Sequence, residues 1–529
     1  GVEHQAASVV IGPVHHGSLP APKAPDGSRQ GSDGLLGGPL LHSAAHGGPD
    51  VTDVLVAELR DALGPRGWLD PADAGSVLTG WRKAYSGTPV LVARPDTVEG
   101  VQAVVRACAD HAAAVVTQGG NTGLSGGSVP IDDLPDGRPS VLLLTSRLNR
   151  IESVDPDRFT ATVQAGCTIE QVQQAAAAVD RQLAMDWGAR GTATVGGAIA
   201  TNAGGLNVLR YGNTRRHVLG IEAVLADGRV FDGLRALRKD NTGYDLKQLF
   251  IGAEGTLGVV TRAVLELQPA LAHHRTLFAA LTGLDRATDL YGLARSIDAG
   301  GLTAFELVPE MGVAAAVDVL GITRPIDTRA EWYLMARFSG SEPVADTVTR
   351  FLSAAADRGW VADAVVAETA AQEANLWLLR DELPPEILID SKGAKFDAAV
   401  PIDRIPEFQR GVEAVAARVC GPEAVVFSFG HLGDGNLHVY VLPSLEHGGR
   451  LAPDLVAAVT AEVDGLIWDL GGTISAEHGI GQDLLGRLTG QKSQVEFDLL
   501  RAVKAALDPT DLFNPGKGAQ AIAHSTRPD

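Results

Sequence analysis

The chain has 529 residues, more than one hydrophobic core can organise, so its length predicts two or three domains. Hydrophobic residues make up 45% and charged residues 20% of the chain, the composition of an ordinary globular protein. The formal net charge of -20 argues against a nucleic-acid-binding surface, because such a surface would be basic. No run approaches the roughly 18 apolar residues of a membrane span. Three scattered cysteines and the lack of a secretory signal predict a cytoplasmic protein without disulfides.

Residues 1–50 are rich in Gly, Pro, Ser, Ala and His and lack periodicity, which predicts a disordered leader. We interpret four histidines of this leader as linker residues rather than metal ligands: His15, His16, His42 and His46. Order is expected to begin with a helix at 51–63, where apolar positions recur at helical spacing.

Strands and helices alternate from residue 89 to residue 179. Short aliphatic runs predict the strands, and apolar positions on one helical face predict the helices. The expected strands are 89–93, 113–117, 141–144 and 160–164, and the expected helices are 97–111 and 169–179. This alternation is typical of the α/β or α+β class.

Glycine becomes rarer from residue 275 to about residue 425, which indicates a separate α+β domain. Its expected strands are 331–338 and 396–400, and its expected helices are 345–358 and 371–379. Glycine-rich turns return from residue 426 and precede a helix predicted at 494–507. We therefore expect four parts: 1–50, 51–270, 271–425 and 426–529.

A glycine-rich loop, Gln118–Gly127, follows the strand predicted at 113–117. Glycine and asparagine tolerate positive φ, so successive backbone N–H groups of such a loop can face a phosphate. The alternative is a surface turn, but five glycines in ten residues make a turn that is costly in backbone entropy. The chain contains neither a P-loop motif nor G-x-G-x-x-G, so a P-loop or Rossmann site has no support.

Small residues are also dense between residues 185 and 261, in runs such as Val195–Gly205 and Ile251–Thr261. This density lets backbone pack against a flat, extended ligand. Within the stretch, Asp227-Gly228 is typical of a hairpin turn.

Two motifs near the C-terminus combine metal-ligand residue types with a base. His431 and His438 stand seven residues apart in a glycine-rich octet, and Glu477 adjoins His478 in Ser-Ala-Glu-His-Gly. Neutral imidazoles and a carboxylate suit zinc, iron or manganese. The alternative is a hairpin whose histidines are satisfied in a core.

Longer motifs reveal a family resemblance. From about residue 51 to 517 the chain resembles the vanillyl-alcohol oxidase and p-cresol methylhydroxylase superfamily. The motifs H-x-G-D-G-N-x-H, A-E-H-G and G-A-E-G-T-L-G are typical of its 2-hydroxy-acid dehydrogenases, and Arg238–Gly252 is most similar to the D-2-hydroxyglutarate enzymes. The resemblance implies an α+β fold with a two-part FAD-binding domain at 51–270, a substrate (cap) domain at 271–425, and a C-terminal metal and catalytic segment at 426–529 that returns to the flavin.

The resemblance also implies the residues that bind FAD. Backbone amides of one loop would hold the pyrophosphate: Gln118, Gly119, Gly120, Asn121, Thr122, Gly123 and Leu124. Others would line the remaining parts of the cofactor: Asp186, Gly191, Thr192, Thr194, Gly196, Gly197, Thr201, Asn202, Gly204, Gly258, Val260 and, in the closing segment, Asn514.

The implied reaction is oxidation of a small D-2-hydroxy acid to the 2-oxo acid, with the hydride passing to flavin N5. His431, His438 and Glu477 would hold one divalent metal, zinc in the first place and iron or manganese otherwise. His478 would be the base, a task that suits a histidine of near-neutral pKa, and a metal on the hydroxyl would lower the pKa of that group.

The resemblance further implies that Arg380 and Lys395 hold substrate carboxylates and that Tyr440 contacts the substrate. Without the resemblance, Arg380 is better explained as a charge on a helix surface and Lys395 as a solvated side chain. Tyr440 stands where the D-2-hydroxyglutarate enzymes have Asn, Pro384 where they have Thr, and Gln482-Asp483-Leu484 where a basic residue is common. These departures predict a D-2-hydroxy acid other than 2-hydroxyglutarate, such as a monocarboxylate with an apolar or aromatic tail.

Two other functions compete with this prediction. One is a transferase without net redox, similar to alkyl-dihydroxyacetone-phosphate synthase, but that family has a run of histidines where this chain has Ala476-Glu477-His478. The other is a flavin- or metal-binding module without catalysis. A dehydrogenase without cysteine motifs for a further redox centre must pass electrons to an external acceptor: an electron-transfer flavoprotein, a quinone or a cytochrome, with direct reduction of oxygen as the alternative. We also expect a homodimer.

Overall fold

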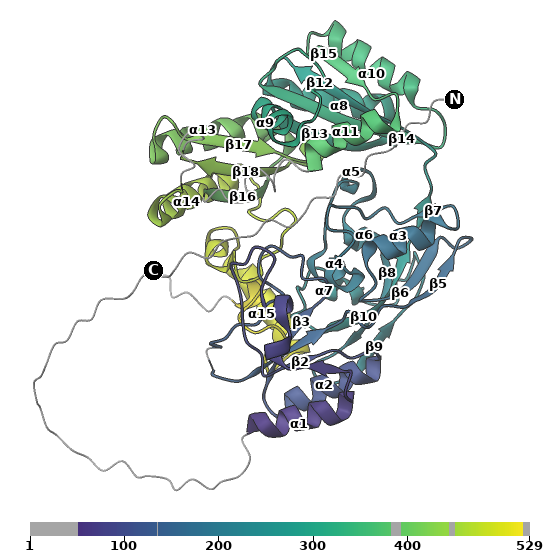
Figure 1. Ribbon diagram of the computed structural model, residues 1–529, viewed down its shortest axis with the longest axis vertical. Helices are drawn as coiled ribbons and strands as arrows, with labels where there is room; N and C mark the ends of the chain where they lie inside the picture. The colour runs from purple at the N-terminus through teal and green to yellow at the C-terminus, as the bar shows by residue number, and fades with distance from the viewer. Residues whose placement is uncertain (1–50, 135, 382–392, 444–449, 522–529) are drawn as a thin grey trace, which may run out of the picture. The chain divides into compact units, whose positions relative to one another are not determined.

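The computed structural model describes residues 51–134, 136–381, 393–443 and 450–521 (Figure 1). The leader predicted at 1–50 and Pro384 lie outside these residues. Helices and mostly antiparallel sheets make up the described part of the chain, so the predicted α+β class is confirmed. None of the described helices is both long and apolar enough to cross a membrane.

The first sheet has the strand order β1-β2-β4-β3. Its strands are β1 (Trp68–Leu69), β2 (Leu91–Ala93), β3 (Ala114–Gln118) and β4 (Ser140–Leu144), and β2 and β3 run parallel to β4. Two helices share a core with it, α1 (Val51–Leu63) and α2 (Val98–Asp110). Because β3 is an edge strand that leads into Gly119, the glycine loop starts at a fixed point of this sheet.

The second sheet is antiparallel, with the order β5-β6-β10-β8-β9. Its strands are β5 (Ile151–Asp155), β6 (Thr160–Gln164), β8 (Val218–Val224), β9 (Val230–Gly233) and β10 (Val259–Glu266). Helices α3 (Ile169–Ala177) and α4 (Val195–Thr201) bury their apolar sides in its core. The predicted turn at Asp227-Gly228 joins β8 and β9, and Gly228 has the left-handed φ of 76° that such a turn needs. Short elements complete this region: β7 (Arg181–Gln182), α5 (Val208–Tyr211), α6 (Thr214–His217), α7 (Lys247–Phe250) and β11 (Gln268–Pro269).

The third sheet is antiparallel, with the order β13-β14-β12-β15. Its strands are β12 (His273–Leu281), β13 (Leu302–Pro309), β14 (Trp332–Gly340) and β15 (Val361–Val366). Helices α8 (Ala287–Asp298) and α10 (Ala345–Asp357) pack into the core on one side. Helices α9 (Glu310–Leu320) and α11 (Ala370–Asp381) pack into a separate core on the other.

The fourth sheet has the order β16-β18-β17 and carries the metal-site motif. Its strands are β16 (Ala394–Ala399), β17 (Val425–Phe429) and β18 (Asn436–Leu442). One face packs on α13 (Ile405–Cys420) and α14 (Pro453–Asp469) in the core shared with the third sheet. The predicted boundary at residue 425 falls at the start of β17, inside this sheet, because β16 precedes it along the chain.

The C-terminal segment comes back to the first sheet. After α15 (Gln494–Leu507), Phe513 bridges Val115 of β3 in parallel, and Asn514 N donates to Val115 O at 2.9 Å. The chain therefore places Asn514 beside the strand that leads into the glycine loop.

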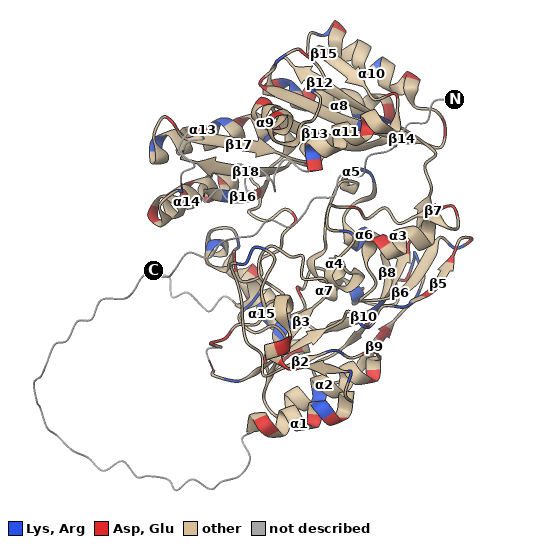
Figure 2. Cartoon of the chain, in the orientation of Figure 1, with Lys and Arg blue, Asp and Glu red and all other residues tan. Residues whose placement is uncertain are grey.

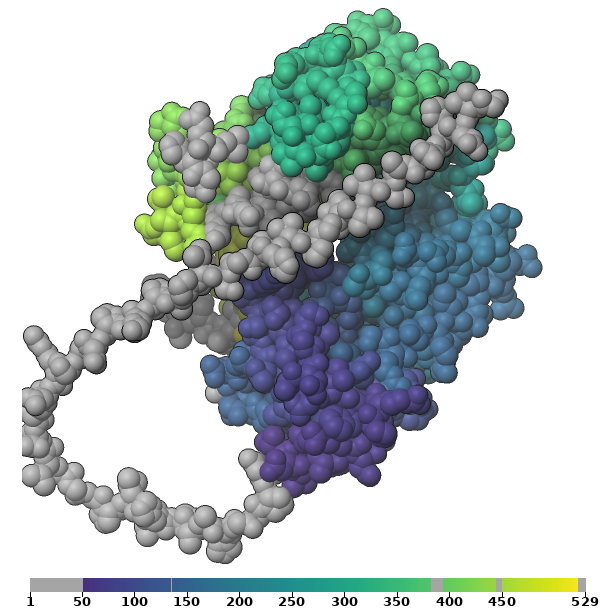
Figure 3. Space-filling view, in the orientation of Figure 1, coloured from purple at the N-terminus to yellow at the C-terminus, as the bar shows by residue number. Residues whose placement is uncertain are grey.

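The predicted helices and strands are all present, and the helices at 51–63 and 494–507 have the predicted bounds. Acidic and basic residues alternate along helices such as α2 and α13 (Figure 2). The purple and blue parts of the chain adjoin in the space-filling view (Figure 3), and Val224 and Val259 of the second sheet pack into the core of the first.

Candidate active site

A cavity of about 400 Å³ lies between the glycine loop, α4 and the turn that precedes β10. Most of the predicted FAD residues line it: Gln118, Gly119, Gly120, Asn121, Thr122, Gly123, Leu124, Thr194, Gly196, Gly197, Thr201, Gly204, Gly258 and Val260. Glu477 and His478 line the same cavity, so the cofactor loop and the C-terminal motif share one space. The volume is within the range of a cofactor pocket.

The backbone amides of Gly119 to Ser125 donate to no acceptor within the described ranges. The loop is nevertheless fixed, because Asn121 Nδ2 donates to Thr79 O at 2.9 Å and Asn121 itself has a left-handed φ of 53°. A Cβ on Gly120 would lie 2.0 Å from Thr192 O, so this position has no room for a side chain. A row of fixed, unpartnered N–H groups on a cavity wall fits a phosphate, as the FAD pyrophosphate would require.

Five predicted FAD residues do not line this cavity: Asp186, Gly191, Thr192, Asn202 and Asn514. Thr192 lies behind Gly120, and Asn202 caps α4 while its Oδ1 accepts from Arg215 N at 2.9 Å. Asn514 lies one layer back, where its Nδ2 donates to Glu254 O at 2.8 Å. The larger side chains among the lining residues that were not predicted include Trp81, Trp187, Phe250 and Glu254. Glu254 stands in the G-A-E-G-T-L-G motif, so the motif itself was the available signal.

The free face of the fourth sheet holds two rows of side chains across β16, β18 and β17. In one row Asp397 is opposite His438, which is opposite Phe429. In the next row Lys395, Tyr440 and Phe427 are opposite one another. Side chains two residues apart on a strand share a face, so the two rows lie side by side.

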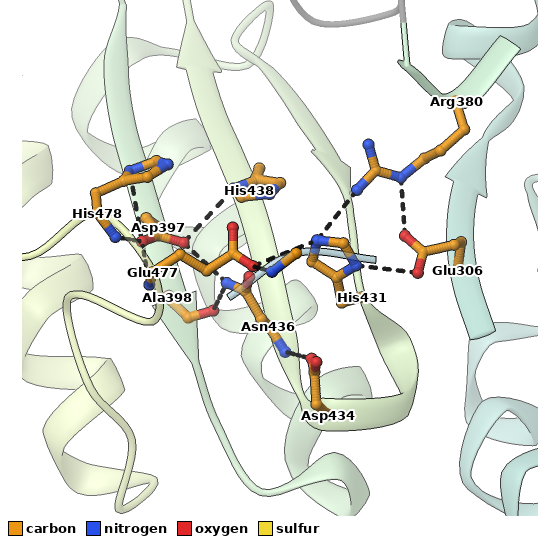
Figure 4. Close-up of polar contacts among 11 residues, drawn as sticks. Glu306, Arg380, Asp397, Ala398, His431, Asp434, Asn436, His438, Glu477 and His478 are labelled. Carbon is orange, nitrogen blue, oxygen red and sulfur yellow. Dashed lines mark hydrogen bonds and ion pairs between the residues drawn. The ribbon is translucent and has the colours of Figure 1, made fainter. Parts of the chain in front are cut away.

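The three predicted metal ligands converge at the first row, where His438 meets His431 and Glu477 (Figure 4). One donor atom each from His431, His438 and Glu477 lies within 4.8 Å of the others. Glu477 Oε1 is 3.6 Å from His431 Nε2 and accepts from Gly205 N at 3.0 Å. A second set with the same spacing, Asp397, His438 and His478, shares His438.

The charges around these ligands fit a cation. Burial would lower the pKa of His431, but the carboxylates of Glu306 and Glu477 raise it to about 9, so these neighbours favour positive charge at this place. Burial lowers the pKa of His438 to about 4, against the carboxylates that raise it, so this imidazole is in the neutral form that a metal binds. Two nitrogens and a carboxylate in reach of one another are a donor set for zinc, iron or manganese.

Glu306 lies behind His431 on the Nδ1 side, and Arg380 contacts both residues, with its Nη2 3.4 Å from His431 Nε2. Glu306 Oε1 is 3.0 Å from His431 Nδ1, and Arg380 Nε donates to Glu306 Oε2 at 2.8 Å. Burial would raise the pKa of Glu306, but His431 and Arg380 lower it to about 2. This arrangement orients His431 Nε2 toward Glu477, as a metal ligand requires.

Asp397 binds several residues of the 426–529 segment. Its Oδ2 accepts from the backbone N–H of Glu477 at 2.8 Å and of His478 at 3.0 Å, and its Oδ1 accepts from Asn436 Nδ2 at 2.9 Å. His478 Nδ1 lies 3.4 Å from Oδ2. Burial would raise the pKa of Asp397, but His478 and His438 lower it to about 2, so the carboxylate is ionised.

Arg380 is buried, which decides between its two interpretations. Its side chain is 7% exposed, so the interpretation as a helix-surface charge is wrong. Lys395 is half-buried, with Nζ 5.5 Å from the centre of the Tyr440 ring, and its pKa is lowered by burial and by Arg82. Asp483, where a basic residue is common, accepts from Tyr85 Oη at 2.8 Å and therefore joins the catalytic segment to the N-terminal part of the chain.

Asp397 and Glu306 were not among the residues predicted from the sequence. Each had a weak signal, since each is an acidic residue inside a run that forms a buried strand: Lys395-Phe396-Asp397 in β16 and Phe305-Glu306-Leu307 in β13. A buried carboxylate in such a run needs a partner, and the partners are the predicted ligands.

Comparison with known proteins shows to which class of proteins the chain belongs. A family model described as "FAD binding domain" matches residues 89–233, and one described as "FAD linked oxidases, C-terminal domain" matches residues 272–518. The solved structure of p-cresol methylhydroxylase with substrate bound has a TM-score of 0.67 at 18% identity, covering 90% of this chain and 98% of that one, which shows a shared fold. The chain is therefore an FAD-binding protein with the p-cresol methylhydroxylase fold.

The relatives define the family. Mitochondrial D-2-hydroxyglutarate dehydrogenase of Danio rerio is 35% identical over 470 residues, 88% of this chain and 85% of the relative. D-2-hydroxyglutarate dehydrogenase of Xanthomonas citri pv. viticola is 35% identical over 472 residues, 88% of this chain and 97% of the relative. The chain belongs to the FAD-linked 2-hydroxy-acid dehydrogenase family that contains these enzymes, which confirms the resemblance seen in the motifs.

Proposed function

We propose that the chain oxidises a D-2-hydroxy acid with the help of a divalent metal, zinc in the first place, held by His431, His438 and Glu477. One observation carries the proposal: these donor atoms lie within 4.8 Å of one another, next to His478, and Glu477 and His478 also line the cavity that suits FAD. A substrate at this place would contact the metal site and the cofactor together.

His478 is proposed to take the hydroxyl proton. Asp397 Oδ2 lies on the Nδ1 side of the ring at 3.4 Å, which favours the tautomer that leaves the Nε2 lone pair free. When bound, the metal would act as a Lewis acid that lowers the pKa of the substrate hydroxyl, and FAD would accept the hydride. Asp397 then stabilises the imidazolium that forms as the proton moves.

Arg380, Lys395 and Tyr440 are proposed to bind the substrate. Arg380 Nη2 lies 3.4 Å from His431 Nε2, next to the metal ligands, which suits the carboxylate next to the reacting carbon. Lys395 and Tyr440 form the next row of the sheet, so they would meet the substrate tail. Phe427 and Phe429 back the Tyr440 ring, and this aromatic surface favours a tail that is apolar or aromatic.

We further propose a cytoplasmic homodimer that passes its electrons to an external acceptor: an electron-transfer flavoprotein, a quinone or a cytochrome.

Metal removal tests the proposal. Protein loaded with FAD is stripped of metal with a chelator, reloaded with zinc or manganese, and mixed anaerobically with D-2-hydroxy acids while the flavin band is followed. We expect flavin reduction to slow on stripping and to return on reloading. His478→Gln should keep FAD and metal but lose flavin reduction, whereas the exposed His274→Gln is the matched control. An unchanged rate after stripping, or in His478→Gln, would contradict the assignment.

A further inference from the structure

Glu254 binds the backbone that follows His478. Its Oε1 accepts from Ile480 N at 2.8 Å and its Oε2 from Gly481 N at 2.7 Å. Glu254 also lines the cofactor cavity, and Gly479 leaves so little room that a Cβ there would lie 3.1 Å from the Glu254 carboxylate. The side chain therefore joins the cavity wall to the segment that carries the base.

Asn514 and Lys517 support Glu254 from behind. Asn514 Nδ2 donates to Glu254 O at 2.8 Å, and Lys517 Nζ lies 3.4 Å from Asn514 Oδ1. Lys517 Nζ also donates at 3.0 Å to the carbonyl of Gly127, which is in the glycine-rich loop. Lys517 is only 1% exposed, so its amino group binds partners inside the protein instead of contributing to the charged surface.

Backbone strain marks the same place. Glu254 has a φ of 51° and Asn514 a φ of 45°, and the two are hydrogen bonded to each other. A left-handed conformation costs energy in a residue with a side chain, and such residues gather where the surroundings impose a function. Glycine at either position would avoid this cost but would remove the contacts described above.

Two buried ionisable side chains, Lys517 and Glu254, also lie here. Burial lowers the pKa of Lys517 to about 7, although Glu254 raises it. Burial raises the pKa of Glu254, while the Ile480 and Gly481 amides lower it. Two buried ionisable groups contribute little to stability compared with apolar side chains, but they fix geometry.

We propose that Glu254, supported by Asn514 and Lys517, is a positioning residue that holds His478 in register with the cofactor loop. Ser125 of that loop also holds this segment, since its Oγ lies 3.1 Å from both His478 O and Gly479 O and its carbonyl accepts from Gln482 N at 2.8 Å. Glu254 touches neither metal ligand nor substrate in this assignment. The inference rests on the proposed role of His478 as the base.

The test compares four forms of the FAD- and metal-loaded enzyme: wild type, Glu254→Gln, Lys517→Met and the double variant. Gln keeps one acceptor oxygen but turns the other into a donor that faces an N–H group. We expect Glu254→Gln to slow flavin reduction about 100-fold at saturating substrate, because small displacements of a catalytic group have effects of this size. The apparent Kd for substrate should change less than about 3-fold, since the substrate contacts are untouched. The double variant should lose less than the product of the single losses, because the residues share one network.

Lys504→Met is the matched control. Lys504 is another buried lysine of the same region, whose Nζ donates to Asp508 Oδ2 at 2.6 Å and to Thr256 O at 2.8 Å without contacting the His478 segment. We expect Lys504→Met to lower the melting temperature but to keep the wild-type reduction rate. A reduction rate in Glu254→Gln within 3-fold of wild type, or equal losses in Glu254→Gln and Lys504→Met, would overturn the proposal.

Hydrogen–deuterium exchange separates this proposal from the proposed function. We expect the peptide that covers Ile480 and Gly481 to exchange faster in Glu254→Gln than in wild type, whatever the enzyme oxidises. If wild type shows no reduction with any D-2-hydroxy acid while this exchange rises, the proposed function fails and the anchoring by Glu254 stands. Unchanged exchange at Ile480 and Gly481 would refute the anchoring itself.

Discussion

Replacing Asp397 with Asn should slow flavin reduction while leaving the cofactor cavity intact. Asp397 binds the backbone of both Glu477 and His478 and also lies next to the His478 ring. Asn is the same size, but only one of its two terminal atoms accepts hydrogen bonds. Whichever way the amide is oriented, an N–H group of the protein then faces an NH2 group.

The magnitude follows from the bonds that change. Two backbone N–H groups donate to the ionised Oδ2 at 2.8 and 3.0 Å, and each such bond to a charged acceptor contributes about 1.5–3 kcal/mol, compared with about 1 kcal/mol for a neutral one. Losing that difference twice, together with the charge that stabilises the His478 imidazolium, costs about 2–4 kcal/mol. If this cost is expressed at the transition state, the reduction rate falls roughly 30- to 1,000-fold.

The assay is anaerobic stopped-flow reduction of the flavin at saturating D-2-hydroxy acid, with metal content measured on the same samples. Asp464→Asn is the control, because Asp464 is equally buried but pairs with Arg487 at 2.8 Å, away from His478. Both variants should lose stability, and only Asp397→Asn should lose rate. A rate within 3-fold of wild type in Asp397→Asn with full metal content would refute the reasoning.

Three further predictions concern charge, substrate and cofactor. Glu306→Gln should lower the free energy of unfolding of metal-free protein by about 3 kcal/mol at pH 7, because the native pKa of Glu306 is lowered from 4.5 to about 2. Since this stabilisation is complete only above the unfolded pKa, roughly half of it should be gone at pH 3. Urea unfolding of wild type and Glu306→Gln at both pH values measures it, and an equal difference in unfolding free energy at the two pH values would contradict the prediction. Tyr440→Asn should raise the ratio of kcat/KM for D-2-hydroxyglutarate to kcat/KM for an aromatic D-2-hydroxy acid by about 10-fold or more. An unchanged ratio would mean that Tyr440 does not contact the substrate tail. Gly123→Val should fold normally, because a Cβ there meets no heavy atom within 4 Å, but its side chain should enter the cavity and weaken FAD binding in equilibrium dialysis. Gly120→Ala should instead destabilise the fold, since its Cβ would lie 2.0 Å from Thr192 O. The reverse pattern would contradict the loop assignment.

Local structure was predictable because its causes are local. The helix at 494–507 has its bounds fixed by the capping box of Ser493 and Glu496 and by apolar spacing, both visible in the sequence. The glycine loop after β3 was predictable for the same reason, since its unusual backbone depends on its own residue types.

The layer behind the metal ligands was not predictable in this way. Glu306 meets His431 only because β13 bridges the start of the metal motif, with Leu307 paired to Gly430, a contact between segments far apart in the sequence. Asp397 meets His478 through the pairing of β16 with β18 and through a bridge to Ser475. Helical spacing likewise cannot tell which face of α11 is covered, so Arg380 could be read as exposed until its partner Glu306 was in place.

The central claim is that this enzyme takes hydride from a D-2-hydroxy acid onto its flavin at a metal-assisted site. The most direct measurement is the anaerobic visible spectrum of FAD- and metal-replete protein as D- and L-2-hydroxy acids are added one at a time. We expect at least one D-acid to bleach the flavin band and its L-enantiomer to leave it unchanged. Bleaching by L-acids alone, or a flavin band that no acid of a broad panel bleaches, would contradict the claim.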